Sequence, residues 1–190
     1  MAHCTGCGRT GVTTKVLPAY KAVGLGAPFE VILEGAVKVD TCVACGATLG
    51  TYIPDMEGLF HAVVFSRALE PRKLTGAELR FMRKAMGWKA KDLAKHLGVT
   101  AEHLSRCENS SKVMAPATEK LFRLYALLKT PDKSALAELD LSAVFDFIEI
   151  NATWDVTKPL VFHFVRRPVP AEPVNEGDEK WRKDTQKKAA

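Results

Sequence analysis

The sequence predicts an α+β protein with an N-terminal β domain, an all-α bundle and a small C-terminal β appendage. Three observations support this prediction: two C-x-x-C pairs lie among short extended segments, apolar residues recur at helical spacing through residues 72–129, and side chains alternate in character through residues 159–165. We expect an N-terminal domain, a connecting helix with its linker, a helical domain and a C-terminal extension at residues 1–53, 54–71, 72–129 and 130–190.

Length and composition limit the class of protein. The chain has 190 residues, of which 47% are hydrophobic and 26% are charged, so it is expected to fold. It is too short for a TIM barrel, which typically needs about 250 residues. No apolar run approaches the roughly 18 residues of a membrane-spanning helix, and residues 1–4 lack the basic start and apolar stretch of a signal peptide. We therefore expect a cytoplasmic protein with no membrane partner.

Four of the five cysteines form two C-x-x-C pairs. The pairs are Cys4 with Cys7 and Cys42 with Cys45. Gly8 and Gly46 follow them and permit the positive φ of a tight metal-binding turn. Two such turns offer four thiolates to one tetrahedral ion, so we expect one structural Zn²⁺ per chain. A redox disulfide is the alternative, but that chemistry is typical of a βαβ context. His3 is an alternative ligand, although a flanking histidine is more often a spectator.

Short strands are expected between the two cysteine pairs. Prolines and glycines interrupt this stretch and argue against a helix. Residues 29–33 and 36–40 have the composition of two strands, and Gly35 between them permits a tight hairpin turn. Together with the cysteines this is the layout of a zinc ribbon. So small a unit buries little apolar surface, and the metal should provide much of its folding energy.

A connecting helix is expected over residues 54–69. Leu59, Val63 and Val64 share one face of this helix, and Pro71 ends it. The boundary with the next domain therefore lies near residue 70.

Three short helices follow, and each has a start or stop signal. The first begins after Thr75 and ends at Gly87. The second ends at Gly98, and Thr100 caps the third. The side chains expected to face inward are Leu79, Met82, Met86, Leu93, Ala94, Leu97, Val99, Leu104 and Cys107. A small residue at Ala94 lets two helices approach, so we predict a helix-turn-helix, with an unrelated helical hairpin as the alternative.

A fourth helix is expected to close the bundle. It begins at Pro116 and carries an apolar stripe at helical spacing. The stripe consists of Leu121, Leu124, Tyr125 and Leu128. We expect it to belong to the core, and we assign Cys107 to core packing in preference to redox sensing.

The positive charge is concentrated in the helical domain. Residues 72–129 hold 13 basic and 5 acidic side chains, a net charge of +8, whereas residues 1–71 and 130–190 carry −1 and −2. A basic segment between two slightly acidic ones is typical of a phosphate-binding surface. A solvated helical face is the alternative.

The helical motif resembles that of a known family. The residues that carry the resemblance are Leu93–Ala94, Leu97–Thr100 and Ser105–Asn109, which look like the Xre phage-repressor type of helix-turn-helix. With the cysteine ribbon and the connecting helix, residues 1–129 resemble MqsA (YgiT-type) antitoxins and related stand-alone regulators. The resemblance implies that the ribbon binds zinc and, in true antitoxins, an RNA-cleaving toxin. It also implies that the helical domain forms a homodimer and represses its own operon.

The resemblance places the third helix of the motif in the major groove of DNA. Arg106 is the expected base reader, because arginine can donate two hydrogen bonds to guanine. His103 lies near it by helical spacing, and Glu102, where the family usually has an amide, can accept from cytosine. The residues expected to contact phosphates are Lys89, Lys91, Thr100 and Lys112. Ala90 and Ser110 also depart from the family pattern.

The C-terminal extension has no counterpart in the short antitoxins. Residues 139–150 are rich in apolar side chains, residues 159–165 alternate as a strand does, and a second strand is expected at residues 179–183. These two strands form a small β-hairpin around a flexible loop at residues 168–178. The aromatic residues here serve a homodimer or partner contact, or pack against the helical domain.

The sequence therefore predicts a DNA-binding transcriptional regulator, a repressor that binds an inverted repeat in double-stranded DNA as a homodimer. An antitoxin that masks a protein toxin through its zinc domain is the main alternative. A zinc-dependent enzyme is the weakest interpretation, because four thiolates leave no open position for water and no catalytic motif is present.

Overall fold

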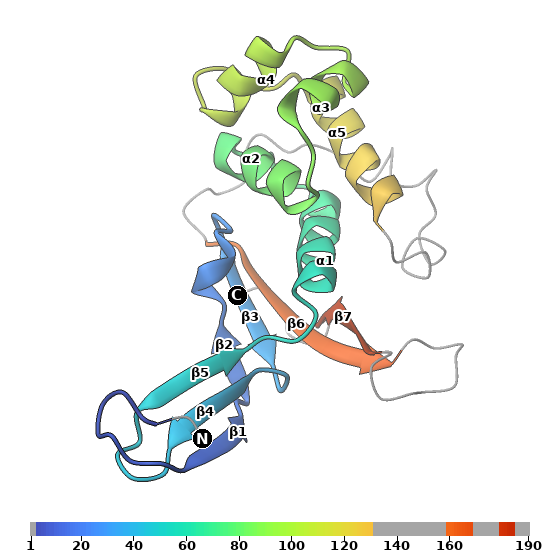
Figure 1. Cartoon of the computed structure of the whole chain (residues 1–190). Coiled ribbons are helices and arrows are strands. Elements are labelled where there is room, and N and C mark those ends of the chain that lie inside the picture. The colour runs from blue at the N-terminus through green and yellow to red at the C-terminus, as the bar shows by residue number, and fades with distance from the viewer. Residues whose placement is uncertain (1–2, 131–158, 169–178, 185–190) are drawn as a thin grey trace. The chain divides into compact units, whose positions relative to one another are not determined.

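The computed structural model describes residues 3–130, 159–168 and 179–184 (Figure 1). These residues contain five α-helices, one short 3-10 helix at Val23–Leu25, and seven strands in two sheets, so the α+β class is confirmed. The chain divides into two compact units. One comprises residues 1–23, 30–56 and 161–190, and the other comprises residues 24–29 and 57–160.

The first sheet consists of three antiparallel strands that meet the cysteine turns. Its order is β1-β4-β5, formed by Val12–Val16, Lys38–Cys42 and Thr48–Tyr52, with an irregularity between Asp40 and Thr41. Every residue of β1 and β5 is exposed, and only Val39 and Cys42 of β4 are buried. This sheet therefore has almost no apolar core of its own, as a ribbon that depends on a metal requires.

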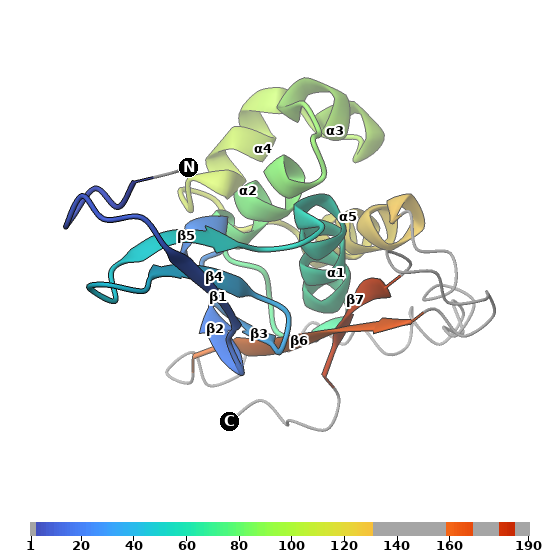
Figure 2. The same ribbon diagram turned by 60° about the horizontal axis from the view of Figure 1, so that its bottom comes forward.

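The second sheet joins strands from both ends of the chain. Its order is β2-β3-β6-β7, formed by Ala19–Lys21, Glu30–Glu34, Val161–Pro168 and Glu179–Lys183. Strand β3 pairs in parallel with β6, beside which it lies in Figure 2, and β6 pairs with β7 antiparallel. Leu33, Phe162, Phe164 and Trp181 are buried in this sheet, and the Trp181 indole donates to the carbonyl oxygen of Pro54 at 3.0 Å.

The prediction of a hairpin around Gly35 is wrong. Strands β3 and β4 lie in different sheets: β3 has β2 and β6 as neighbours, and β4 has β1 and β5. Gly35 has the expected positive φ of 61°, but its amide donates to the carbonyl of Pro18, which precedes β2. The preceding strand β2 and the distant strand β6 thus satisfy the two edges of β3, so the turn at Gly35 does not determine its pairing.

The C-terminal strands occur where they were expected, as β6 and β7, and they pair with each other. They do not form a separate appendage, because β6 adds to the edge of β3 over five residue pairs. The apolar segment at residues 139–150 and the loop predicted after residue 168 lie outside the described residues.

The helical unit follows the start and stop signals of the sequence. Helix α1 spans Met56–Leu69, α2 Gly76–Ala85, α3 Ala90–His96, α4 Ala101–Glu108 and α5 Pro116–Lys129. Thr75 caps α2 with a reciprocal bond from Glu78, Thr100 caps α4, and Gly98 ends the turn after α3 with a φ of 66°. The buried side chains include Leu79, Met82, Leu93, Ala94, Leu97, Leu104 and Cys107, as predicted.

The prediction that the apolar stripe of α5 faces the core is wrong. Leu121 and Leu128 are 44% and 52% exposed. The buried face lies beside that stripe and consists of Glu119, Phe122, Arg123, Ala126 and Leu127. Two charged residue types occupy core positions here because they pair with each other, and Lys73 Nζ also lies 3.6 Å from Oε2 of Glu119.

Buried ion pairs join α1 to the rest of the helical unit. Arg67 of α1 donates to both carboxylate oxygens of Glu78, at 2.8 and 3.1 Å, and to the carbonyls of residues 70, 72 and 73. Arg123 of α5 pairs with Glu119 at 2.8 Å and donates to the carbonyl of Ala68 at the end of α1 and to those of residues 70 and 72 after it. The helix predicted as a connector is thus part of the helical core.

Each helix in the described part of the chain is too short or too polar to cross a membrane.

Candidate metal centre and nucleic-acid interface

The four paired cysteines meet at one point. Their sulfur atoms all lie within 4.8 Å of one another, although the two pairs are separated by more than thirty residues of sequence. Cys4 lies 3.7 Å from Cys45, and Cys7 lies 3.7 Å from Cys42, measured between Sγ atoms. An ion that binds four sulfurs tetrahedrally at about 2.3 Å sets them about 3.8 Å apart. The cluster therefore has the dimensions of a Zn²⁺ site.

The two cysteine turns have the same backbone geometry. The amide of Gly8 donates to the carbonyl of Cys4 and the amide of Gly46 donates to the carbonyl of Cys42, both at 2.8 Å. These glycines have φ of 71° and 73°, a conformation that is costly for residues with a Cβ. Strand β4 ends at Cys42 and β5 begins at Thr48, so the sheet positions the second turn. His3 lies outside the sulfur cluster and approaches the carbonyl of Gly8.

The electrostatics of the cluster favour a cation. Backbone hydrogen bonds from Cys7 and Gly6 lower the pKa of Cys4 to about 7. The backbone bond from Arg9 lowers the pKa of Cys7, but the thiols of Cys45 and Cys42 and burial raise it, to about 12 overall. Successive thiolates this close repel one another, so a bound divalent ion is needed for all four to ionise. Zinc, when bound, supplies that charge and a fixed tetrahedral geometry.

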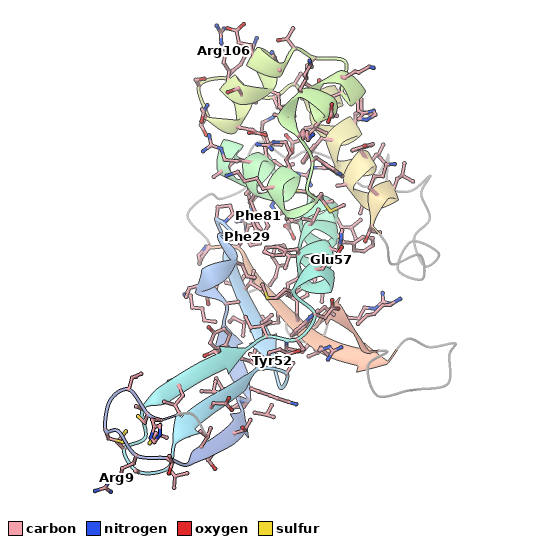
Figure 3. The ribbon with its side chains drawn as sticks, viewed as in Figure 1. Arg9, Phe29, Tyr52, Glu57, Phe81 and Arg106 are labelled. Atoms are coloured by element: carbon pink, nitrogen blue, oxygen red, sulfur yellow. The ribbon has the colours of Figure 1, made fainter. Side chains whose placement is uncertain are left out.

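Helices α3 and α4 meet at a tight turn. The amide of Val99 donates to the carbonyl of Ala94 at 3.0 Å, and the hydroxyl of Thr100 accepts from the amide of His103 at 3.0 Å. Leu104 and Cys107 of α4 are buried against the unit, which leaves the opposite side of α4 to solvent. On that side Glu102 and Arg106 are exposed, and Figure 3 shows Arg106 projecting from α4 at the edge of the unit.

Residues 75–136 match the family described as a helix-turn-helix domain. The match begins at the N-cap of α2 and includes α2 to α5. It supports a regulator of the Xre type, and it points to a DNA-binding regulator rather than to an enzyme. No curated protein and no solved structure matches the chain.

Within the helix-turn-helix domain the predicted base readers lie on α4. Arg106 donates from Nη2 to Oε1 of Glu102 at 2.6 Å, one helical turn away, and both side chains are exposed. His103 is half-buried, and its amide is bound by the helix cap. The exposed guanidinium of Arg106 has the donor geometry that a base edge or a phosphate requires.

The four residues predicted to contact phosphates are all exposed. Lys89 precedes α3, Lys91 lies in its first turn, and Thr100 and Lys112 flank α4. The Thr100 hydroxyl accepts a hydrogen bond as the helix cap and still has its own hydrogen to donate. These side chains of α3 and of the segments that flank α4 are therefore accessible to a nucleic-acid backbone.

Sequence reasoning missed the ion pair between Arg83 and Glu108 that holds α4 in place. Arg83 of α2 binds both oxygens of Glu108 at the end of α4, at 2.5 and 2.9 Å, and this hydrogen-bonded pairing raises the pKa of Arg83. Arg83 also donates to the carbonyl of Trp88 before α3. One guanidinium thereby fixes both helices of the motif. No local pattern marks such a pair, because its members are 25 residues apart.

Cys107 has the environment of a structural residue. Its side chain is 2% exposed, and burial raises the pKa of its thiol. A buried thiol that resists ionisation is a poor nucleophile. This burial agrees with the assignment of Cys107 to core packing.

Proposed function

We propose that the chain is a sequence-specific DNA-binding repressor whose cysteine cluster holds one structural Zn²⁺. The observation that carries the proposal is the exposed face of α4, where Arg106 and Glu102 lie in the helix that follows the turn of a helix-turn-helix domain. In such domains this helix enters the major groove, and its exposed side chains read base edges. We propose that Arg106 recognises a guanine by donating hydrogen bonds to its edge in the major groove.

The distribution of charge supports DNA as the partner. Residues 72–129 carry a net charge of +8, and the remainder of the chain carries −3. Arg67, Arg83 and Arg123 are engaged inside the unit, so its exposed lysines and Arg106 supply most of the attraction for phosphates. Each lysine placed on a phosphate releases condensed counterions, which makes binding dependent on salt.

We propose that two copies bind an inverted repeat with half-site centres about 34 Å apart, one helical turn of DNA. The exposed Leu121 and Leu128 of α5 offer an apolar face for the second copy. Replacement of both by Glu should give a monomer in sedimentation and weaken binding to the full repeat at least tenfold, while Lys120→Glu, on the same helix, should leave the dimer intact. A dimer that persists in the double variant contradicts this choice of face.

The DNA-binding proposal is tested on the region upstream of the chain's own gene. Gel-shift titration should give a saturable complex on a fragment that contains an inverted repeat, at a protein concentration that leaves a scrambled duplex free. Footprinting should then protect two half-sites in successive major grooves. Equal affinity for the repeat and the scrambled duplex would refute sequence-specific recognition.

A second candidate function, that of an antitoxin, is favoured by the three-stranded sheet. Val12 and Val16 of β1 and Tyr52 of β5 are 47%, 54% and 60% exposed, on strands that have an open edge within the described sheet. Exposed apolar side chains on an open sheet edge suit a protein partner. Co-expression with the product of the adjoining gene tests this role. A complex that is lost in Val16→Lys but kept in Leu128→Glu would favour the antitoxin.

A further inference from the structure

The helical unit contains a cavity beside α2. A cavity of about 650 Å³ lies between α2, the end of α4 and residues 25–28. Ala77 and Ala85 lie one turn before and after Phe81 on α2, and these small side chains leave the space around its ring open. Figure 3 shows Phe81 beside Phe29, on the side of α2 away from Arg106.

One wall of the cavity is aromatic. The ring of Phe81 meets Phe29 edge to face at a centroid distance of 5.6 Å and lies 6.3 Å from the ring of Phe60. These rings come from three different segments of the unit, and Phe60 and Phe81 line the cavity directly. Aromatic rings at these distances present both edges and faces, which suits the planar apolar body of an aromatic ligand.

The other wall is cationic. Arg80 and Lys84 lie one turn apart on α2 and both line the cavity. Arg80 donates to the neutral side-chain oxygen of Asn109, and Lys84 forms no ion pair within the part of the chain that the structure describes. Glu108, which also lines the cavity, is already neutralised by Arg83. The cavity therefore carries two positive charges with no compensating anion.

We propose that this cavity is a binding site for a small aromatic carboxylate. The carboxylate would pair with Arg80 and Lys84, and the ring would pack against Phe81 and Phe60. The combination of a cationic wall with an aromatic wall selects against inorganic anions, which lack the apolar body, and against neutral aromatics, which lack the charge. Because Arg80 also holds Asn109 after α4, a bound ligand would exchange that hydrogen bond for its own.

The test compares three probes on the full-length, zinc-loaded protein by calorimetric titration without DNA. We expect 2-naphthoate to bind saturably, and 2-naphthamide and inorganic phosphate to bind at least tenfold more weakly. Lys84→Gln and Arg80→Gln should each weaken naphthoate binding about tenfold, because a charged hydrogen bond to the carboxylate is lost. Lys95→Gln, the loss of an exposed lysine on α3, is the matched control and should leave binding unchanged.

Several results would overturn the proposal. Equal binding of the amide would show an apolar groove, and equal binding of phosphate would show a general anion surface. If naphthoate does not bind, the cavity is not a binding site for an aromatic carboxylate. Competitive displacement of naphthoate by a short DNA duplex would assign the two cations to phosphate contacts. The titrations of the three probes are independent of operator recognition, because they are carried out in the absence of DNA; only the displacement experiment adds a duplex.

Discussion

In the structure Arg106 and Glu102 bind each other across one turn of α4, with 2.6 Å between Nη2 of the arginine and Oε1 of the carboxylate. The two side chains are 61% and 73% exposed, so water and salt screen the pair and it costs little to break. Both residues were predicted to read bases. Arg106 must therefore leave Glu102 to reach a guanine, and Glu102 competes with DNA for the guanidinium.

This pairing predicts different effects for the two residues. Arg106→Ala should cost on the order of 1 to 3 kcal/mol on the inverted repeat and much less on random duplex, because only the base contact is specific. Glu102→Gln should strengthen binding to both duplexes, because it removes a negative charge near phosphates and frees Arg106. Gel-shift titration of both variants on both duplexes measures these effects. If Arg106→Ala lowers the two affinities by the same factor, His103 becomes the next candidate for the base reader.

Lys112 should behave as a phosphate contact. It is exposed just after α4, and its removal should weaken binding to the repeat and to random duplex about equally. The slope of log K against log salt should become shallower by about one unit. Titrations at several salt concentrations give this slope, with Lys129→Ala at the end of α5 as the control. A slope that stays unchanged in Lys112→Ala would place this lysine away from the DNA backbone.

The zinc site should be separable from the helical unit. Cys42→Ser removes one of the four sulfurs, so we expect the bound zinc, one ion per chain in elemental analysis, to be lost. The three-stranded sheet buries almost no apolar surface and should unfold with it, whereas DNA binding should be largely retained because the helical unit has its own core. Limited proteolysis measures whether the three-stranded sheet has unfolded. Metal-free protein with a protease-resistant N-terminal segment would contradict the structural role of zinc.

The sequence predicts the helical motif and the cysteine cluster because their signals are local. Thr75, Thr100 and Pro116 mark helix starts by their own chemistry, and a C-x-x-C turn needs only four residues to aim its sulfurs. The parallel pairing of β3 with β6 joins Glu30 to Val161, and no local pattern encodes a contact over such a distance.

The buried face of α5 could not be predicted for a different reason. Glu119 and Arg123 have the polarity of surface residues, and Leu121 and Leu128 have that of core residues, so a hydrophobic pattern selects the wrong face. The charged pair is buried because Arg123 satisfies carbonyl groups at the end of α1 and just after it, which need hydrogen-bond partners. Carbonyl groups carry no signal in a sequence, so the need for such a partner is visible only in the structure.

Acid should destabilise the helical unit through Glu78. Burial alone raises the pKa of this carboxyl, but the hydrogen bonds and charge of Arg67 outweigh burial and lower it from 4.5. A carboxyl with a lowered pKa stabilises the folded state above its unfolded value, and that contribution is lost as the pH falls through the folded value. The unfolding free energy of the unit should therefore decline below about pH 4.5, as denaturant titrations from pH 7 to pH 3 can measure.

The Glu78→Gln variant checks this assignment. It should lose about 3 to 5 kcal/mol of stability at pH 7, because Arg67 is left buried without its counter-charge. Its stability should also depend less on pH in the acid range. If the unfolding free energy of the variant falls with pH in the same way as that of the unchanged protein, other carboxyls cause the loss of stability in acid. Glu57→Gln, on the exposed face of α1, is the matched control.

Gly76 should be essential for the contact between α2 and α4, although its backbone is that of an ordinary helix. A Cβ at this position would meet the carbonyl oxygen of Cys107 first, then Ser110 Oγ at 2.6 Å and the carbonyl oxygen of Glu108 at 2.8 Å. Two of these are backbone atoms of α4 and cannot rotate away, so Gly76→Ala must move one helix relative to the other. In an exposed helix this substitution would stabilise the folded state by helix propensity, whereas here we expect the protein to lose roughly 1 to 3 kcal/mol of stability from overpacking.

The displacement of α4 in the Gly76→Ala variant should also weaken DNA binding. Chemical denaturation and gel shift measure the two effects, and Gly87→Ala, where no atom crowds the new Cβ, separates crowding from backbone strain. A Gly76→Ala protein as stable as the unchanged chain would show that α2 and α4 are not packed this closely.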